Sequence, residues 1–284
     1  MVATKIVTAT VNDALHPDDF NELKQARILL ENPGLVARIS NLAGRPIEKS
    51  IELLPGAVGE VVQNGTRRAV EKALDIAVGT LNTGQASPAA NRLHQLVATA
   101  SGGVGGAFGL AALSLELPIS TTIMLRSIAD IARSEGEDLA HPEARLHCLQ
   151  VLALGGRSGR DDGSETAYFA ARAALARTVS EAAAHIARKG LAEKSAPAIV
   201  RLISLIASRF SIVVSEKAAA QAVPVIGALG GAALNAIFIG HFQDMAYGHF
   251  VVRRLERIYG AEVVRRTYEA ISIEREPKVS GSIN

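Results

Sequence analysis

Hydrophobic and polar residues follow a helical period along most of this chain, and proline cuts the pattern into segments. Nine of the ten prolines fall where an apolar period starts or stops. Because proline is tolerated in the first turn of a helix and breaks its interior, most of them predict helix starts. The predicted helices cover roughly residues 18–31, 47–54, 57–82, 88–115, 119–135, 142–154, 164–190, 197–222, 224–247 and 248–271.

The segment over residues 164–190 has the clearest helical signal. Its hydrophobic residues recur at offsets of seven, four, three and four, which places them on one stripe of a helix. They are Tyr168, Leu175, Val179, Ala182 and Ile186. Ser164, which follows two aspartates, is a candidate N-cap, and Gly190 is a candidate helix end.

Composition also predicts an all-α fold. Hydrophobic residues make up 48% of the chain and aromatic residues only 4%. Good helix formers dominate, and the alternation of β-branched residues that marks strands is nearly missing. Since no polar linker divides the chain, we expect an N-terminal arm over 1–17, one multi-helix bundle over 18–272 and a flexible tail over 273–284.

The charge balance and the cysteine content restrict the protein class. The formal net charge is +2, from 30 basic and 28 acidic residues, whereas nucleic-acid-binding proteins usually carry a strong basic excess. A single cysteine, Cys148, excludes an internal disulfide and is typical of a reducing compartment. It is expected to be a small buried hydrophobe. The N-terminal residues lack the long apolar stretch of a signal peptide, so we expect a cytoplasmic protein.

Two long segments contain no Asp, Glu, Lys or Arg. Leu93–Leu115 has 23 residues and Ala218–Gln243 has 26, and each could cross a hydrocarbon core of roughly 30 Å as a helix. Their glycine, alanine and polar residues make insertion marginal. The pattern therefore favours two apolar central helices, rich in glycine and alanine and buried in the bundle. The alternative is a helical pair that is buried in the soluble form and can meet a membrane.

Arg253, Arg254 and Arg257 follow the second uncharged segment. Arginines beside an apolar segment suit an anionic lipid surface, so they are candidate membrane-binding or anion-binding residues. Glu256 and Glu262 lie in the same stretch. An ordinary surface helix of mixed charge is therefore the competing interpretation.

The strongest polar constellation consists of His241, Asp244 and His249. Such side chains could ligate a metal or supply a base, but the spacing is not that of an HExxH motif, and structural hydrogen bonding is the competing role. Glu116 lies among apolar residues and would need a charged partner if buried, for which Arg126 or a histidine is expected. Convergence of Glu116 with His241 would strengthen the interpretation as a metal site.

Several long motifs resemble the EcsC protein family. They are IELLPGAVGEVVQNGTRRAVEKALDIAV, GLAALSLELPISTTIMLRSIADIARSEGEDL, SETAYFAARAAL and SEKAAAQAVPVIGALGGAALNAIFIGHFQDMAYGHFVVRRLERIYG. The similarity runs from about Glu22 to Ile271. It implies a helical fold but no assigned reaction and no catalytic residues, because members of the family are generally uncharacterised. The family takes its name from a protein encoded beside an ABC-transporter pair, which suggests a transporter as a partner.

Together these features favour a non-enzymatic helical accessory protein. We expect it to act at the inner face of the cytoplasmic membrane by binding lipid or a membrane-protein partner such as a transporter. The alternative is a metal-dependent hydrolase with a divalent cation held by Glu116, His241, Asp244 and His249. A soluble dimerising scaffold is a third interpretation, and the pattern does not fix the oligomeric state.

Overall fold

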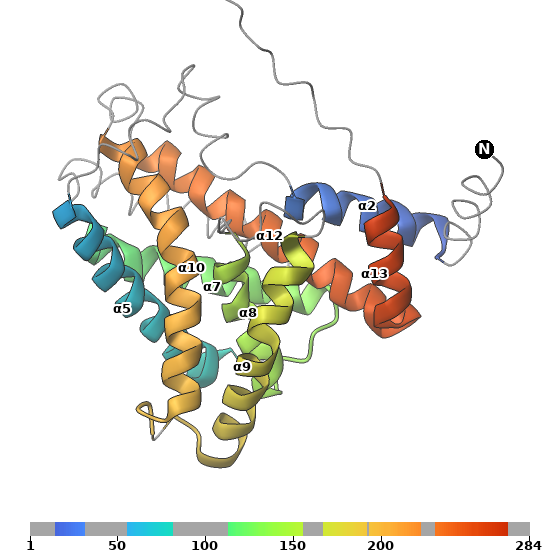
Figure 1. Cartoon of the computed structure of the whole chain (residues 1–284), viewed down its shortest axis with the longest axis horizontal. Coiled ribbons are helices and arrows are strands. Elements are labelled where there is room, and N and C mark those ends of the chain that lie inside the picture. The colour runs from blue at the N-terminus through green and yellow to red at the C-terminus, as the bar shows by residue number, and fades with distance from the viewer. Residues whose placement is uncertain are drawn as a thin grey trace, which may run out of the picture.

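The structure is a computed structural model that describes residues 15–31, 56–81, 113–155, 167–191, 193–222 and 231–271. These residues form eight helices and no strand, which confirms the all-α prediction (Figure 1). In chain order the helices are α2 (Pro17–Glu31), α5 (Gly56–Thr80), α7 (Leu113–Ser134), α8 (Pro142–Leu154), α9 (Ala167–Lys189), α10 (Pro197–Ala222), α12 (Gly231–Tyr259) and α13 (Ala261–Ala270).

Polar contacts between helix ends show how α5, α7 and α10 are oriented. Arg133, near the end of α7, donates from Nη2 to the carbonyl oxygen of Leu81, directly after α5, at 2.8 Å. Helices α5 and α7 therefore run parallel. Lys194, just before α10, pairs with Asp75, late in α5, at 2.6 Å. Helix α10 therefore runs antiparallel to both.

Helix α12 runs parallel to α7, as its contacts with α7 and with the loop after α7 show. Gln243 donates from Nε2 to the Ser127 hydroxyl at 2.7 Å, and Arg253 donates from Nε to Glu137 Oε1 at 2.8 Å. Both pairs are separated by 116 residues in sequence. The first turns of α5, α7 and α12 and the last turns of α10 therefore gather at one end of the bundle, at the upper left of Figure 1. We call residues 116–121, 213–221 and 233–239 of this end the junction.

The core has one large and one small cluster of buried side chains. The large one joins α5, α7, α8, α9, α10 and α12, and α8 lies inside it with residues 144–153 all buried. Cys148 is among them, which confirms its predicted burial. The small cluster joins α2 and α13 to the C-terminal half of α12. Figure 1 shows α2 and α13 side by side at the right of the bundle.

Two predicted helix boundaries are wrong. Pro118 lies inside α7, within two turns of its start, where a missing N–H costs at most one intrahelical bond. Gly248 lies inside α12, and the chain breaks instead at Gly260, whose φ of 88° is readily adopted only by glycine. The predicted helix at 47–54, residues 88–112, most of the arm and the tail lie outside the described residues.

Helix α10 is the one described helix that is long and apolar enough to cross a membrane by length and composition. The span Pro197–Gln221 has 25 residues, and its 18-residue apolar window has a mean hydropathy of 1.8 and is 39% buried. The helix packs against α5, α8 and α9. Core helices of bundles have the same composition, so this property alone does not distinguish the two roles.

Candidate functional site

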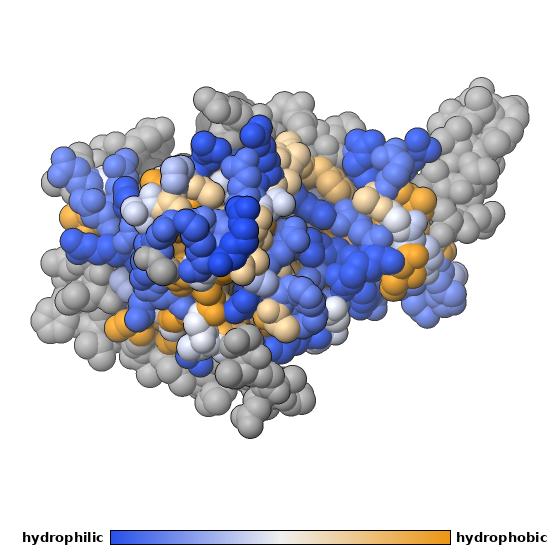
Figure 2. All heavy atoms as spheres, turned by 90° about the horizontal axis from the view of Figure 1, so that it is seen from below, coloured by the Kyte–Doolittle hydropathy of each residue, from blue (hydrophilic) through white to orange (hydrophobic). Residues whose placement is uncertain are grey.

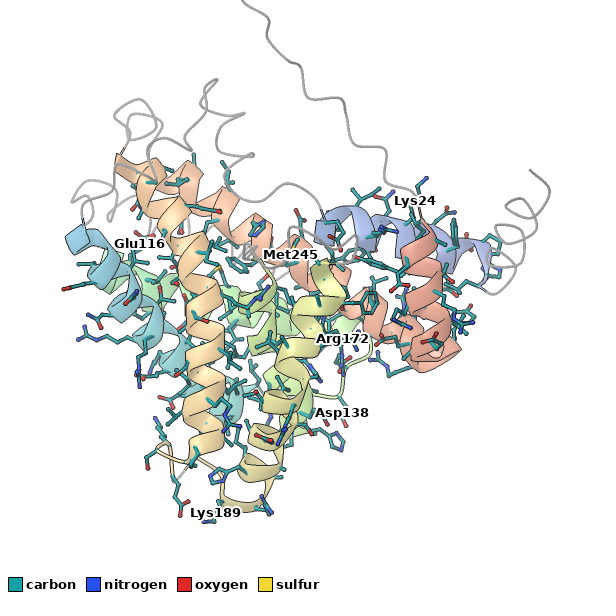
Figure 3. The ribbon with its side chains drawn as sticks, viewed as in Figure 1. Lys24, Glu116, Asp138, Arg172, Lys189 and Met245 are labelled. Carbon is teal, nitrogen blue, oxygen red and sulfur yellow. The ribbon has the colours of Figure 1, made fainter. Side chains whose placement is uncertain are left out.

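A fully buried lysine lies at the junction. Lys217 on α10 donates from Nζ to Glu116 Oε1 on α7 at 2.7 Å and to Asn235 Oδ1 on α12 at 3.0 Å. The Lys217 side chain is 0% exposed and that of Glu116 is 5% exposed. One charged group thus links three helices that are far apart in sequence. Figure 3 labels Glu116 at this end of the bundle.

The expectation that Arg126 or a histidine would pair with Glu116 is wrong, because its partner is Lys217. Burial lowers the pKa of the Lys217 ammonium, and the Glu116 carboxylate counteracts this by favouring the charged form. Glu116 also lies at a favourable helix terminus, in the first turn of α7.

Aromatic side chains surround the ammonium on its α12 side. Lys217 Nζ lies 4.7 Å from the centroid of the Phe238 ring, within the range of a cation–π interaction. Phe238 contacts Phe242 at a centroid distance of 5.3 Å, and Phe242 contacts Phe210 at 5.4 Å. These rings are fully buried, so the ion pair lies in an apolar environment where its Coulombic interaction is strong.

The ion pair joins the borders of the two uncharged segments. Glu116 directly follows the segment Leu93–Leu115, and Lys217 directly precedes the segment Ala218–Gln243. The structure describes only the last three residues of the first segment and all but residues 223–230 of the second. The residues that end one segment and begin the other are therefore held together, although they are 101 positions apart.

Sequence reasoning missed Lys217 and Asn235. A signal for Lys217 exists, because it follows Phe210, Val213 and Val214 at offsets of seven, four and three and so lies on the same stripe of α10. A lysine on an apolar stripe indicates a buried charge that needs a partner. Nothing in the local pattern of Asn235 indicates its role, since its partner is on another helix.

The proposed metal ligands have separate hydrogen-bond partners. His241 donates from Nε2 to the carbonyl oxygen of Gly155 at 3.1 Å, and His249 Nδ1 lies 2.8 Å from the Tyr168 hydroxyl. Glu116 binds Lys217 as described. Among the described residues, no group of three or more His, Cys, Asp or Glu side chains is arranged to hold a metal ion. The metal-dependent hydrolase stays a hypothesis from the sequence, and Asp244 is a candidate metal ligand only within that hypothesis.

His249 belongs to a buried polar cluster between α8, α9 and α12. Its ring centroid lies 6.1 Å from that of His147, whose Nδ1 is 2.8 Å from Gln150 Oε1. Burial lowers the pKa of His147 to about 4 and that of His249 well below its usual value, and Arg172 and Arg253 act in the same direction. Both rings are therefore neutral near pH 7.

The three candidate anion-binding arginines all pair with carboxylates of this chain. Arg253 and Arg257 bind Glu137, and Arg254 binds Glu135 and Glu22. Glu137 is 5% exposed, so its pairs are largely desolvated. The arginines connect α12 both to α2 and to the loop after α7. Binding of these arginines to a lipid surface stays a prediction, whereas the contacts seen in the structure are with carboxylates of this chain.

Comparison with protein-family models gives one match. The model of the EcsC protein family covers residues 19–255, which include the junction, the histidine cluster and most of the arginine pairs. The match extends from α2 to the last turns of α12, and α13 lies beyond it. Comparisons with curated proteins and with solved structures give no significant match.

Proposed function

Because this chain belongs to the EcsC protein family, we propose that it is a non-enzymatic helical accessory protein acting at the inner face of the cytoplasmic membrane. It binds the lipid surface through the end of the bundle that contains the junction. In a second form of the proposal, the same end binds a membrane-protein partner such as a transporter. Neither proposal needs a cofactor.

The observation that supports this proposal is the ion pair between the borders of the two uncharged segments. Glu116 and Lys217 neutralise one another, and they fix the attachment points of both segments at one end of the molecule. The second segment is divided between the end of α10 and the start of α12, so both of its described parts lie at this end. An end of the bundle where uncharged parts of the chain meet is suited to contact with lipid.

The opposite end of α10 has a different character. Lys189, Glu193 and Lys194 lie at the turn between α9 and α10, and all three are exposed and form ion pairs. Figure 3 labels Lys189 at the bottom of the bundle, and Figure 2, seen from below, shows a face on which hydrophilic side chains predominate. This polarity difference along α10 supports an orientation with the junction toward the membrane.

Vesicle flotation of the full-length protein tests the proposal. We expect flotation with both neutral and anionic vesicles, with only a small gain from anionic lipid, because Arg253, Arg254 and Arg257 are already paired. V225D places a charge in the second uncharged segment and should weaken binding to neutral vesicles by on the order of tenfold or more. S180D, on the exposed face of α9, is the matched control and should leave binding to neutral vesicles unchanged.

Each other result has a defined meaning. Absence of flotation with either vesicle type removes the lipid proposal, and capture by detergent-solubilised membrane proteins would then support the protein-partner form. Flotation with anionic vesicles only, abolished by high salt, would instead indicate binding through basic side chains.

A further inference from the structure

We infer that the Lys217–Glu116–Asn235 cluster is a lock that holds the ends of α7, α10 and α12 together, and that its opening is the step that presents this end to a bilayer. The second part of this inference rests on the proposed function. The first part concerns the protein in water and can be tested without lipid.

The first argument is that the cluster joins all three helices through one ammonium, beside the buried ring of Phe238. An ion pair in such surroundings has two well-separated states. When it is closed, both charges are satisfied, whereas a partly opened pair leaves a desolvated charge without its partner. The cluster therefore opposes small movements and permits only a complete opening.

The second argument is that a bilayer interface can accommodate the opened state. Opening in water would expose Phe238 and Phe242, which are fully buried. At a membrane these rings would enter the hydrocarbon region. The ammonium of Lys217 and the carboxylate of Glu116 lie at the attachment points of the uncharged segments, so both could reach the hydrated headgroup layer. The cost of opening is thus high in water and lower at a bilayer surface.

The third argument is that the lock is confined to one end. Lys217 and Asn235 lie near the ends of α10 and α12, and Glu116 lies in the first turn of α7. Along α12, the arginine pairs with Glu135 and Glu137 begin 18 residues beyond Asn235, or about 27 Å away. They hold the other end of α7 and α12 together. Opening of the junction therefore leaves most of the bundle attached.

Hydrogen exchange followed by mass spectrometry tests the lock in the full-length protein without vesicles. K217M should raise exchange rates of amides in residues 116–121, 213–221 and 233–239 by on the order of tenfold or more, because Glu116 is left without its partner. E116L/K217M replaces both charges with apolar groups of similar size, and it should restore most of the protection that K217M loses, short of the wild-type level because Asn235 loses the bond from Lys217.

R172M is the matched control, because it breaks the ion pair of Arg172 with Glu256 near the other end of α12. It should raise exchange in α9 and the end of α12 and leave the junction unchanged. If K217M fails to fold, E116Q removes one charge and retains an amide oxygen as acceptor, and it should show the same local effect at a smaller size.

Flotation of the same variants tests the second part. K217M should bind neutral vesicles more tightly than the wild type, and E116L/K217M should bind them less tightly than K217M. Unchanged exchange at the junction in both K217M and E116Q would overturn the lock, even if the wild type floats. Local exchange as expected, with no flotation of any variant, would instead support the lock in water and remove the membrane function and the opening step that depends on it.

Discussion

At the scale of single residues, Gly248 determines how closely α2 approaches α12. A Cβ atom at this position would lie 2.7 Å from Leu30 Cγ and 3.0 Å from the carbonyl oxygen of Ala26, both on α2. We expect G248A to lower the free energy of unfolding by about 1–3 kcal/mol, because the backbone oxygen cannot move without shifting α2. Urea denaturation measures this change.

Gly240 provides the control in the same helix. No atom lies within 4 Å of the position that its Cβ would occupy, so G240A should raise the free energy of unfolding by up to about 1 kcal/mol through helix propensity alone. If both substitutions have the same sign and size, the close contact at Gly248 is not a determinant of stability.

Gly248 shows what the sequence could not predict. The pattern predicts separate helices over 224–247 and 248–271, which places Gly248 at a helix boundary. Its role depends on α2, more than 200 residues earlier in the chain. The pair of Glu116 and Lys217 is similar. Burial of Glu116 indicates that a partner is needed, but the choice of Lys217 follows only from the tertiary arrangement that brings the start of α7 near the end of α10.

At the scale of helices, the pattern predicts elements well where proline or a cap marks their ends. Helices α2, α8 and α10 begin at Pro17, Pro142 and Pro197, within one residue of the predicted starts. The prediction fails where a boundary residue is compensated by packing, as at Pro118. It also gives no information on direction. The parallel arrangement of α7 and α12 depends on pairs such as Gln243 with Ser127.

The arginine pairs determine how the loop after α7 is attached to α12. Arg253 binds both carboxylate oxygens of Glu137, at 2.8 and 3.2 Å. We expect R253Q to lower the free energy of unfolding by roughly 2–3 kcal/mol, because the buried Glu137 loses one of the two arginines that bind it in the described part of the chain and keeps Arg257. R265Q is the control, since Arg265 pairs with Glu262 on the exposed face of α13. It should cause no measurable change in denaturation. An equal effect of both substitutions on the free energy of unfolding would show that burial of Glu137 does not determine the cost of losing Arg253.

At the scale of the whole molecule, the ion pairs of α12 are concentrated toward its C-terminal end. The junction contains the buried pair of Lys217 and Glu116, whereas the far end of α12 has a network of five carboxylate–arginine contacts to α2, α9 and the loop after α7. The family model spans both regions. Under the proposed function, the arginine network keeps one end of the bundle closed while the junction end contacts the membrane.

The stability of the whole bundle should also depend on pH through the histidine cluster. His147 and His249 have lowered pKa values in the folded protein, so the unfolded chain binds more protons as the pH falls below about 6.5. Their contribution is fully present above that pH and decreases toward the folded value, about 4 for His147. From pH 7.5 to 4.5, His147 alone should account for a loss of roughly 2–3 kcal/mol in the free energy of unfolding. The pKa of Glu137 is lowered below 4.5, so its contribution is lost mainly below this window.

Urea denaturation at pH 7.5, 6.0 and 4.5 measures the effect, and H147L separates it from other groups. The variant leaves Gln150 without its partner and should be less stable than the wild type at pH 7.5. Its stability should nevertheless fall less steeply toward pH 4.5, because one buried neutral imidazole is gone. Equal slopes for the two proteins would mean that water or the neighbouring Glu143, 3.9 Å from His147 Nε2, already stabilises the protonated ring in the folded bundle.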